Sequence, residues 1–400
     1  MPTAAPHPGE SDYRQVVWAL ALCQILSWAA LYYAFSSFVL PMMRDLSWDK
    51  PTMMGAFTLG LAVWGAATYA VGAAIDQGHG RWVMTLGAVL AGLGFLLWSQ
   101  VRPPPMLHAA CAMLGAAMAM TLYEPAFTVL TKRYPTRYTQ GITTLTLVGG
   151  FASTLSFPAS ALLIQQFGWR GALQVIGAVM LCVVAPLHAW ALRGTPTQDM
   201  PPRAHDAADD ATLHEALRES SFWLLTATFT LYSFAAAALW AHIMPALASK
   251  GLADARALAV VVWFGPAQVA GRLAYLAFGR WVSSRALGLV VLGGLPASLT
   301  IFALADGTVA LLLFALLFGL ANGLVTIVRG SLVPEYFGRE HVGRISGAMS
   351  AIALLSRAAA PLATAWLLIA LPGYRELLLG LAGLGAVAVV AFALARPPAR

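Results

Sequence analysis

Three ionisable side chains lie inside long apolar stretches of the sequence, where charge is costly. Glu124 directly precedes Pro125, Arg272 ends the run GPAQVAGR, and Arg357 lies in SRAAAP. At the centre of a hydrocarbon layer a charge costs about 2.5–3.5 kcal/mol, so each of these groups needs an opposite charge or water. The proline beside Glu124 removes a backbone donor and opens the helix locally, which suits a carboxyl group that loads and releases a proton.

Arg357 is the deepest cation of the sequence, near the middle of its apolar stretch and surrounded by alanines. Its guanidinium keeps its charge, so a carboxylate is the natural counter-ion. That carboxylate is either part of a bound solute or the side chain of Glu124, and the sequence leaves both open. Arg272 lies closer to the end of its stretch, where a long side chain can also extend to the aqueous surface.

Several uncharged or weakly basic side chains in the apolar stretches are further candidates for binding a solute. His242 is a candidate because histidines in general change charge near neutral pH, but a hydrogen-bonded structural histidine near the outer surface is the favoured interpretation. The others carry hydroxyl or amide groups that either bind solute or join helices: Asn322, Tyr32, Tyr33 and Tyr232.

The elements that carry these residues must be membrane-spanning helices. Apolar residues make up 59% of the chain, charged residues 10%, and the mean hydropathy is +0.73. A soluble protein has about 25% charged residues, so a cytosolic enzyme, a disordered chain and a secreted disulfide scaffold are excluded. Stretches of about 19–25 residues cross a bilayer as helices. We predict twelve: 16–40, 52–75, 82–100, 106–130, 140–164, 172–192, 222–248, 257–278, 286–305, 308–333, 345–370 and 377–395.

The basic residues between these stretches predict the orientation. Of the 24 Lys and Arg residues, Arg357 lies within a span and sixteen fall on the side of the two termini. The remaining seven fall on the opposite side: Arg44, Lys50, Arg102, Arg170, Lys250, Arg256 and Arg375. Because cytoplasmic loops are enriched in Lys and Arg, both termini are expected in the cytoplasm, here of a bacterial inner membrane.

A polar segment divides the spans into two groups of six. Residues 193–221 contain three prolines and an acidic cluster (Asp206, Asp209 and Asp210), followed by a short amphipathic piece. We interpret them as a cytoplasmic linker with a partly helical end. The predicted organisation is a tail (1–15), an N-terminal six-helix bundle (16–192), the linker (193–221) and a C-terminal six-helix bundle (222–400).

The two halves resemble each other at matching places. The pattern G-x7-G-R-W occurs at Gly72–Trp82 and again, 199 positions later, at Gly271–Trp281. Gly168-Trp169-Arg170 corresponds to Gly373-Tyr374-Arg375, 205 positions later. Several matches at similar offsets indicate a duplicated six-helix unit.

Two six-helix repeats joined by a polar cytoplasmic linker resemble the major facilitator superfamily. The segment GAAIDQGHGRW resembles that family's loop between the second and third helices, with Asp76 and Arg81 at the acidic and basic positions and Gln77 where a base is usual. The resemblance implies a latch between the bundles; a tight turn with a basic residue is the simpler alternative. The predicted latch residues are Gly72, Asp76, Gly80, Arg81, Gly271, Gly279 and Arg280.

Within that family the sequence is similar to monocarboxylate-type transporters in YYAFSSFVLPMMRDLSW and YEPAFTVLTKRYPTRYTQGI. This resemblance implies a substrate-binding role for Arg272. The family's acid four positions earlier is Gln268 here, and the lysine after its first-helix Tyr-x-Phe is Ser37. The resemblance therefore supports the fold more strongly than it supports the substrate.

These observations predict a transporter and not an enzyme. The sequence has no nucleotide-binding G-x-x-x-x-G-K-[ST], no HExxH or GxSxG, and three cysteines without metal-ligand spacing, so no cofactor or metal is expected. We expect a secondary active transporter that moves a small solute, a small organic anion, by proton-coupled alternating access. The expected partners are the lipid bilayer, the solute and protons; no nucleic acid is expected, and a monomer suffices. The alternatives are an exporter of drug-like or toxic compounds and a non-transporting membrane sensor.

Overall fold

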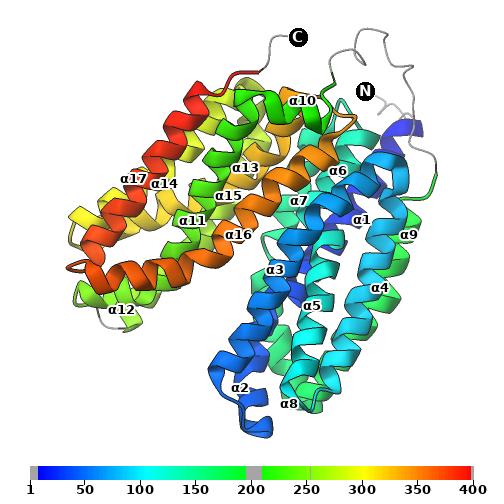
Figure 1. Cartoon of the computed structure of the whole chain (residues 1–400), viewed down its shortest axis with the longest axis horizontal. Coiled ribbons are helices and arrows are strands. Elements are labelled where there is room, and N and C mark those ends of the chain that lie inside the picture. Colours follow the sequence, from blue (N-terminus) through cyan, green and yellow to red (C-terminus); the bar gives the residue numbers. More distant parts are fainter. Residues whose placement is uncertain (1–7, 195–209, 253, 398–400) are drawn as a thin grey trace, which may run out of the picture. The chain divides into compact units, whose positions relative to one another are not determined.

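The computed structural model describes residues 8–194, 210–252 and 254–397. Residues 1–7 of the predicted tail and 195–209 of the predicted linker lie outside these described residues, whereas 8–15 already belong to α1. Every regular element in the described part of the chain is a helix (Figure 1). The elements are α1 (Pro8–Trp28), η1 (Ala29–Tyr33), α2 (Phe35–Leu46), α3 (Lys50–Ala74), η2 (Ile75–His79), α4 (Gly80–Ser99), α5 (Pro104–Thr121), α6 (Tyr123–Arg133), α7 (Tyr138–Gly149), α8 (Ala152–Val179), η3 (Met180–Val184), α9 (Ala185–Ala191), α10 (Leu213–Arg218), α11 (Ser220–Ser249), α12 (Asp254–Val261), α13 (Phe264–Phe278), η4 (Gly279–Trp281), α14 (Ser284–Leu304), α15 (Thr308–Phe337), α16 (Val342–Ala370) and α17 (Tyr374–Leu394).

Ten stretches of the described helices are long and apolar enough to cross a membrane. Two of them, Thr52–Ser99 and Tyr138–Ala191, are 48 and 54 residues long and each contains a break. Gly78 (φ 87°) and Gly168 (φ 67°) leave the helical conformation there and adopt a positive φ that glycine tolerates. If the two long stretches are divided at these glycines, the described helices give twelve apolar segments, which we call arms. All are helical, in agreement with the predicted all-α polytopic fold.

Polar side chains cap the first turns of α3, α10 and α14. The Asp49 carboxylate accepts the Thr52 N–H at 3.0 Å, and this hydrogen bond lowers the pKa of Asp49. Ser283 caps α14 through the N–H of Ala286. Thr212 and Glu215 form a capping box at α10, the short helical piece after the polar segment. Polar residues thus satisfy the orphan amides where each of these helices begins.

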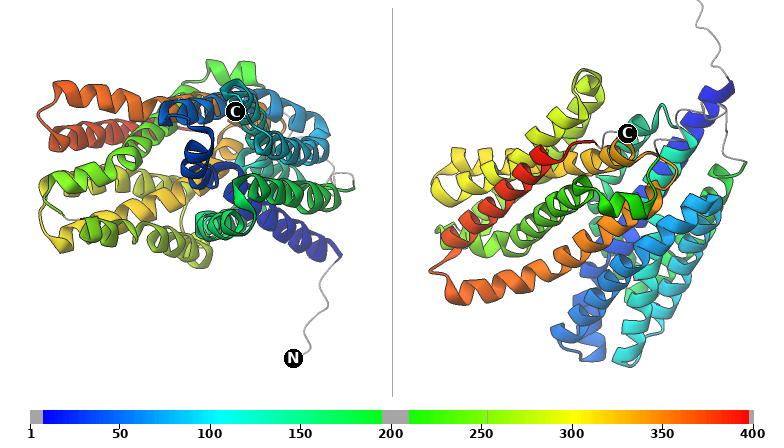
Figure 2. Two further views of the ribbon diagram at one scale, coloured as in Figure 1. Left: turned by 90° about the horizontal axis from the view of Figure 1, so that it is seen from below. Right: turned by 45° about the horizontal axis from the view of Figure 1, so that its top comes forward.

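The described chain forms two compact units. The first contains the residues up to Asp210 together with Arg339–Gly347. In it α3, α4 and α5 run side by side, as the views in Figures 1 and 2 agree. Its core contains Tyr13, Val17 and Leu20 of α1 packed against Met84 and Leu130. The start of α16 therefore belongs, by packing, with helices that lie far from it in the sequence.

The second unit contains Ala211–Gly338 and Ala348–Arg400. In it α14 packs against α15 and α17, α13 against α15, and α11 against α17. Phe302 and Phe314 stack with ring centroids 4.4 Å apart, and Phe264 contacts Phe314 at 5.6 Å. Aromatic rings fill the space between these helices and give the unit a core of its own.

Two arms of the first unit depart from the predicted uninterrupted spans. The predicted span 106–130 is divided at Leu122, whose ψ of −156° ends α5 and begins α6. Gln24 of α1 compensates, because its amide group donates to the carbonyls of Thr121 (2.7 Å) and Leu122 (3.3 Å). The first arm turns through the π-helical η1 and continues past Pro41 to Leu46, beyond its predicted end at residue 40.

Candidate functional site

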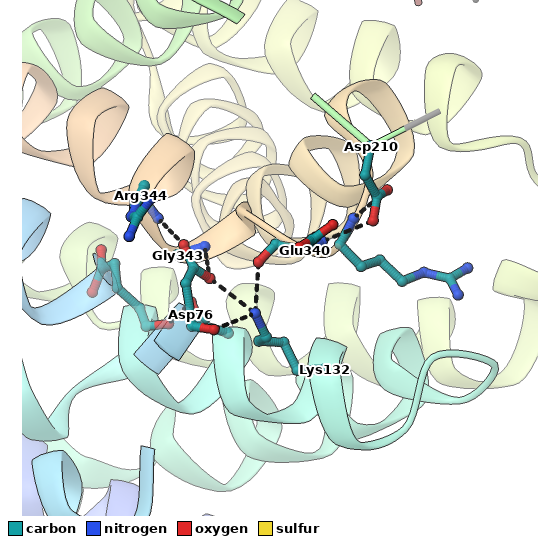
Figure 3. Close-up of polar contacts among 9 residues, drawn as sticks. Asp76, Lys132, Asp210, Glu340, Gly343 and Arg344 are labelled. Atoms are coloured by element: carbon teal, nitrogen blue, oxygen red, sulfur yellow. Dashed lines mark hydrogen bonds and ion pairs between the residues drawn. The ribbon is translucent and has the colours of Figure 1, made fainter. Parts of the chain in front are cut away.

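Asp76 is the centre of a hydrogen-bonded clasp in the first unit (Figure 3). It lies in η2, directly after α3, and its side chain is only 2% exposed. Its two carboxylate oxygens accept the N–H groups of Gly343 (2.9 Å) and Arg344 (2.8 Å), in the first turn of α16. The first four N–H groups of a helix lack intrahelical partners and carry partial positive charge, so a carboxylate is favoured there.

Lys132, in the last turn of α6, completes the clasp. Its ammonium lies 3.3 Å from Asp76 Oδ1 and donates to the carbonyl oxygen of Glu340 at 2.6 Å. It also donates to the backbone oxygen of Asp76 at 3.1 Å. A buried carboxylate is stable only when it is paired and hydrogen-bonded, and these contacts provide both. One lysine therefore joins η2, α6 and the residues before α16.

Asp210 holds the same segment from the other side. Its carboxylate accepts the N–H groups of Arg339 (2.9 Å) and Glu340 (3.0 Å), as Figure 3 shows. Two aspartates thus bind four backbone N–H groups within residues 339–344. We call Asp76, Lys132, Asp210 and residues 339–344 the clasp.

A second polar cluster holds the loop between α6 and α7. Asp12 accepts the Tyr134 hydroxyl at 2.7 Å and lies 3.3 Å from Arg133 Nη2. The Tyr13 hydroxyl donates to the Arg137 carbonyl at 3.1 Å. Burial of Tyr134, and secondarily its hydrogen bond to Asp12, raises the pKa of this phenol, so the tyrosine remains a donor at neutral pH.

The other predicted latch residues do not share one environment, because the glycines pack closely whereas Arg81 is exposed. Gly72 packs directly on the backbone of Gly343, and a Cβ added at Gly80 would lie 2.7 Å from Val129. Arg81 is exposed, with its guanidinium 5.8 Å from the centre of the Trp82 ring, and Lys132 holds the basic position in the clasp instead. In the second unit, Gly271 packs near Leu320 and Gly279 near the Tyr275 ring. The side chain of Arg280 lies outside the described part of the structure.

Glu124 is half-buried in the first turn of α6, directly after the break at Leu122. It lines a small pocket with room for about one water molecule, whose walls come from α3, α5, α6 and the start of α16. Thr68, Gly72, Thr128, Gly343, Ser346 and Gly347 are among its other lining residues. Among the described residues that line this pocket, Glu124 is the one with an ionisable side chain.

Aromatic rings surround the same region of the first unit. Trp28 contacts Tyr123 at 4.9 Å, Tyr32 at 5.5 Å and Trp64 at 5.9 Å between ring centroids. Tyr33 lies 5.2 Å from Tyr32. The predicted solute-binding tyrosines of the first arm therefore pack in one aromatic cluster with Tyr123, the residue that precedes Glu124.

In the second unit, Arg272 is almost fully buried. Its side chain belongs to α13, it is 4% exposed, and Nε donates to the Gly323 carbonyl of α15 at 2.9 Å. A Cβ at Gly323 would lie 2.7 Å from the Gln268 carbonyl, so α13 and α15 are in close contact beside this arginine. The interior of the unit, and not the aqueous surface, surrounds the guanidinium.

The remaining predicted solute-binding residues lie at separate positions in the second unit. Arg357 is exposed on α16. His242 of α11 lies with Nε2 3.4 Å from the Pro361 carbonyl and its ring 6.0 Å from that of Tyr374. Asn322 is half-buried on α15. Tyr232 is 3% exposed, and its hydroxyl has no hydrogen-bond partner among the described residues.

Sequence reasoning missed every member of the clasp except Asp76: Lys132, Asp210 and residues 339–344. In the sequence Lys132 contributes only to the count of basic residues that predicts the orientation. Asp210 is only one member of the acidic cluster in the polar segment. A weak signal exists, because Gly343 and Gly347 are four residues apart and place two small residues on one helix face. No group of three or more His, Cys, Asp or Glu side chains in the described residues could hold a metal ion.

The fold and this site define a polytopic helical membrane protein. Residues 20–308 match the Major Facilitator Superfamily, and the chain belongs to that family. The predicted family and fold are confirmed.

Its relatives include monocarboxylate transporters. Monocarboxylate transporter 11 of Homo sapiens is 30% identical over 70% of this chain and 67% of the relative. The Mus musculus protein of the same name is 32% identical over 59% of this chain, and monocarboxylate transporter 13 of Rattus norvegicus is 26% identical over 69%. The chain spans 53% of the mouse relative and 63% of the rat relative.

Solved structures support the same fold. The human organic anion transporter MFSD10 superimposes with a TM-score of 0.72 at 17% identity, over 96% of this chain and all of that one. The fucose:proton symporter FucP of E. coli also gives 0.72, at 12% identity over 96% of this chain and all of that one. At such identities the likeness concerns the fold alone.

Proposed function

We propose that this protein is a secondary active transporter that couples the movement of a small organic anion to protons by alternating access. The observation that carries the proposal is the position of Glu124. This acid follows a break in a membrane-spanning arm and lines a small pocket beside it. A half-buried carboxyl group next to a cavity that can admit water is able to take up and release a proton.

An anionic substrate is supported by the buried arginine and by the relatives. Arg272 keeps its charge at all accessible pH values and presents a planar fork of donors that matches a carboxylate. The curated relatives are named monocarboxylate transporters. Arg357, His242, Asn322, Tyr32, Tyr33 and Tyr232 remain proposed contacts for the solute.

The first experiment identifies a ligand. Purified protein is heated in the presence of pyruvate, L-lactate or benzoate, because binding to the folded form alone raises the apparent unfolding temperature. The carboxylate that gives the largest shift is then used in proteoliposomes. A shift only with cationic or neutral hydrophobic compounds would support the alternative of a drug exporter.

The second experiment tests the coupling. Glu124→Gln keeps the shape and hydrogen bonding of the side chain but cannot titrate. We expect it to abolish uptake driven by a pH gradient while substrate exchange is largely retained. Uphill uptake by this variant at the wild-type rate would refute proton coupling through Glu124. Ligand binding without any exchange by the wild-type protein would support a sensor.

Arg357 is tested in parallel. Arg357→Lys retains the charge but loses the bidentate geometry, so substrate binding should weaken about tenfold or more if the side chain grips a carboxylate. The alternative, a permanent Glu124–Arg357 pair, predicts that each single substitution impairs folding and that the double substitution restores it.

The proposed setting is a bacterial inner membrane, with both termini in the cytoplasm and a monomer as the functional form. The two bundles are proposed at 16–192 and 222–400, with the clasp on the cytoplasmic side. Labelling of a cysteine introduced at His79 from outside intact cells would contradict this topology.

A further inference from the structure

The start of α1 and the end of α9 are neighbours in the first unit, where the two helices pack against each other. The Arg133 guanidinium joins these ends. Its Nη2 lies 3.3 Å from the Asp12 carboxylate of α1 and 3.5 Å from the carbonyl oxygen of Arg193, two residues after α9. Its Nη1 donates to the carbonyl of Ala191, the last residue of α9, at 3.1 Å. One guanidinium therefore fixes both ends at the same level.

α1 presents one exposed stripe of side chains. Arg14, Trp18 and Leu22 follow one another at intervals of four residues, so they lie on one face of the helix. All three are exposed, and the Trp18 side chain is 58% exposed. Val17 and Leu20, on the other face, belong to the core of the unit. From the helix start inward, a charge is followed by an indole ring and then by an aliphatic side chain.

α9 and the preceding η3 carry a second stripe of the same order. The Arg193 guanidinium lies 5.3 Å from the centre of the Trp190 ring, and Trp190 is 40% exposed. Val183, seven residues before Trp190 and about two turns away, is also exposed. Cys23 Sγ of α1 lies 3.9 Å from the carbonyl oxygen of Val184, so η3 is level with the residues next to Leu22. The two stripes therefore run inward from the same end of the unit.

The charges at the outer end of the stripes are not neutralised within the described part of the chain. Among the described residues, neither Arg14 nor Arg193 forms an ion pair with a carboxylate. Asp12, the described acid of this region, is already engaged by the Tyr134 hydroxyl and by Arg133. Two guanidiniums thus face the surroundings at one end, with indole rings and aliphatic side chains next to them.

We propose that the two stripes bind one phospholipid whose headgroup carries a net negative charge. The guanidiniums of Arg14 and Arg193 bind its phosphate, since arginine matches phosphate oxygens in geometry and charge. Trp18 and Trp190 lie at the boundary between headgroup and hydrocarbon, which is where indole rings are enriched in membrane proteins. The aliphatic side chains contact the acyl chains. Charge complementarity selects this occupant, because the positive charges lie at one end only and the rest of each stripe is apolar.

The test measures lipid binding by the substrate-free protein. The purified full chain in detergent is titrated with dioleoylphosphatidylglycerol or dioleoylphosphatidylcholine, and bound lipids are counted by native mass spectrometry. The two lipids share acyl chains and a phosphate, but choline cancels the net charge. The first phosphatidylglycerol should bind about tenfold more tightly than the first phosphatidylcholine. Equal affinities in the wild-type protein would overturn the proposal.

The double variant Arg14→Gln/Arg193→Gln should lose this preference. Arg44→Gln/Arg102→Gln is the matched control, because it removes two exposed arginines from the same unit and changes the net charge equally. The control should keep the preference for phosphatidylglycerol. A preference that persists in the first variant, or an equal loss in both, would refute the assignment to the stripes. If the first variant does not fold, the comparison of the two lipids on the wild type still decides.

Two further measurements separate charge from structure and lipid from free anion. Arg14→Lys/Arg193→Lys keeps both charges and should retain most of the preference, whereas its complete loss would mean that the substitutions act through the fold. Millimolar inorganic phosphate should not displace bound phosphatidylglycerol, and displacement would make the site one for a free anion. None of these measurements requires transport, so a wild-type result for Glu124→Gln would refute proton coupling and leave the lipid site unaffected.

Discussion

The two G-x7-G-R-W segments share a sequence pattern but differ in chemistry. In the first, Asp76 is buried and binds two N–H groups and a lysine. At the offset of 199 that relates the segments, the second has Tyr275 in place of an acid, and no Asp or Glu occurs between Gly271 and Trp281. Gly279 of the second segment instead packs on the Tyr275 ring.

The shared pattern therefore fixes neither the turn nor the clasp. The first segment turns at Gly78 (φ 87°) in η2, whereas the second passes through the 3-10 helix η4 to the cap residue Ser283. A carboxylate is needed only where helix amides lack partners nearby, and the start of α16 supplies such amides to the first segment. Of the two segments, the first anchors the start of a helix that lies far from it in the sequence.

The largest expected effect comes from removing the charge of Asp76. Asp76→Asn keeps one acceptor oxygen but loses the charge that strengthens two hydrogen bonds, each worth about 1.5–3 kcal/mol. We expect turnover to fall about tenfold, with expression retained. Exchange in proteoliposomes measures it. Tyr275→Phe, at the matching position, should remain within about twofold of wild type; equal losses in both would mean that the segments are equivalent.

Removal of Lys132 should have a smaller effect. Lys132→Gln leaves Asp76 bound to two N–H groups but takes away its ion pair, which is 24% exposed on the lysine side. A loss of about 1 kcal/mol in the free energy of unfolding is expected, together with a severalfold slower exchange. Thermal unfolding in detergent measures the change in stability. Arg81→Gln is the control, since Arg81 lies exposed over Trp82, and a larger effect there would assign the basic role to Arg81.

Asp210 should contribute less again, because it is half-buried and binds the segment before α16 and not the helix itself. Asp210→Asn weakens its contacts with the N–H groups of Arg339 and Glu340. Exchange should slow about twofold, corresponding to roughly 0.5 kcal/mol. Combined with Asp76→Asn the effects should exceed their sum, since both carboxylates hold one segment. Strict additivity would show that they act independently.

The smallest effect is expected for an ion pair that belongs to neither segment. Lys250 lies 2.9 Å from Asp306, and this hydrogen bond and charge lower the pKa of Asp306 from its ordinary 3.8. A lowered pKa in the folded state gives stability that is present above the ordinary pKa and lost as the pH falls through the folded value. Asp306→Asn should therefore leave exchange and stability at neutral pH nearly unchanged, because the exposed aspartate contributes little there. It should remove only part of the acid sensitivity below about pH 4 in thermal unfolding; a clear effect at pH 7 would contradict this.

Most of the fold was predictable, because the bilayer acts on each segment separately. Arms such as α14 (Ser284–Leu304) and α17 (Tyr374–Leu394) lie close to the predicted 286–305 and 377–395. Pro125 indicates a local opening of its arm, but the end of α5 at Leu122 was not predictable, since nothing in the local hydropathy marks it. The carbonyls of Thr121 and Leu122 at the break accept hydrogen bonds from Gln24, about a hundred residues earlier, which compensates for the lost helical bonds.

The candidate site was predicted in part. The sequence indicates Asp76 as a cytoplasmic acid in a glycine-rich turn and Glu124 as an acid inside an apolar span, because both stand out from their neighbours in polarity. It assigns the basic partner to Arg81, which is near in sequence, whereas Lys132 lies near Asp76 in space. The roles of the proposed solute contacts in the second unit remain predictions.

Hydropathy, segment length and short patterns are properties of the local chain, so the residue order is enough to indicate a membrane protein, helical spans and a pattern shared by the two halves. What Asp76 binds follows from the fold alone. Its partners are the backbone N–H groups of Gly343 and Arg344, 267 and 268 residues away. Every residue except proline carries such a group, so no side-chain pattern announces which amides will be left without a partner and which acid will reach them.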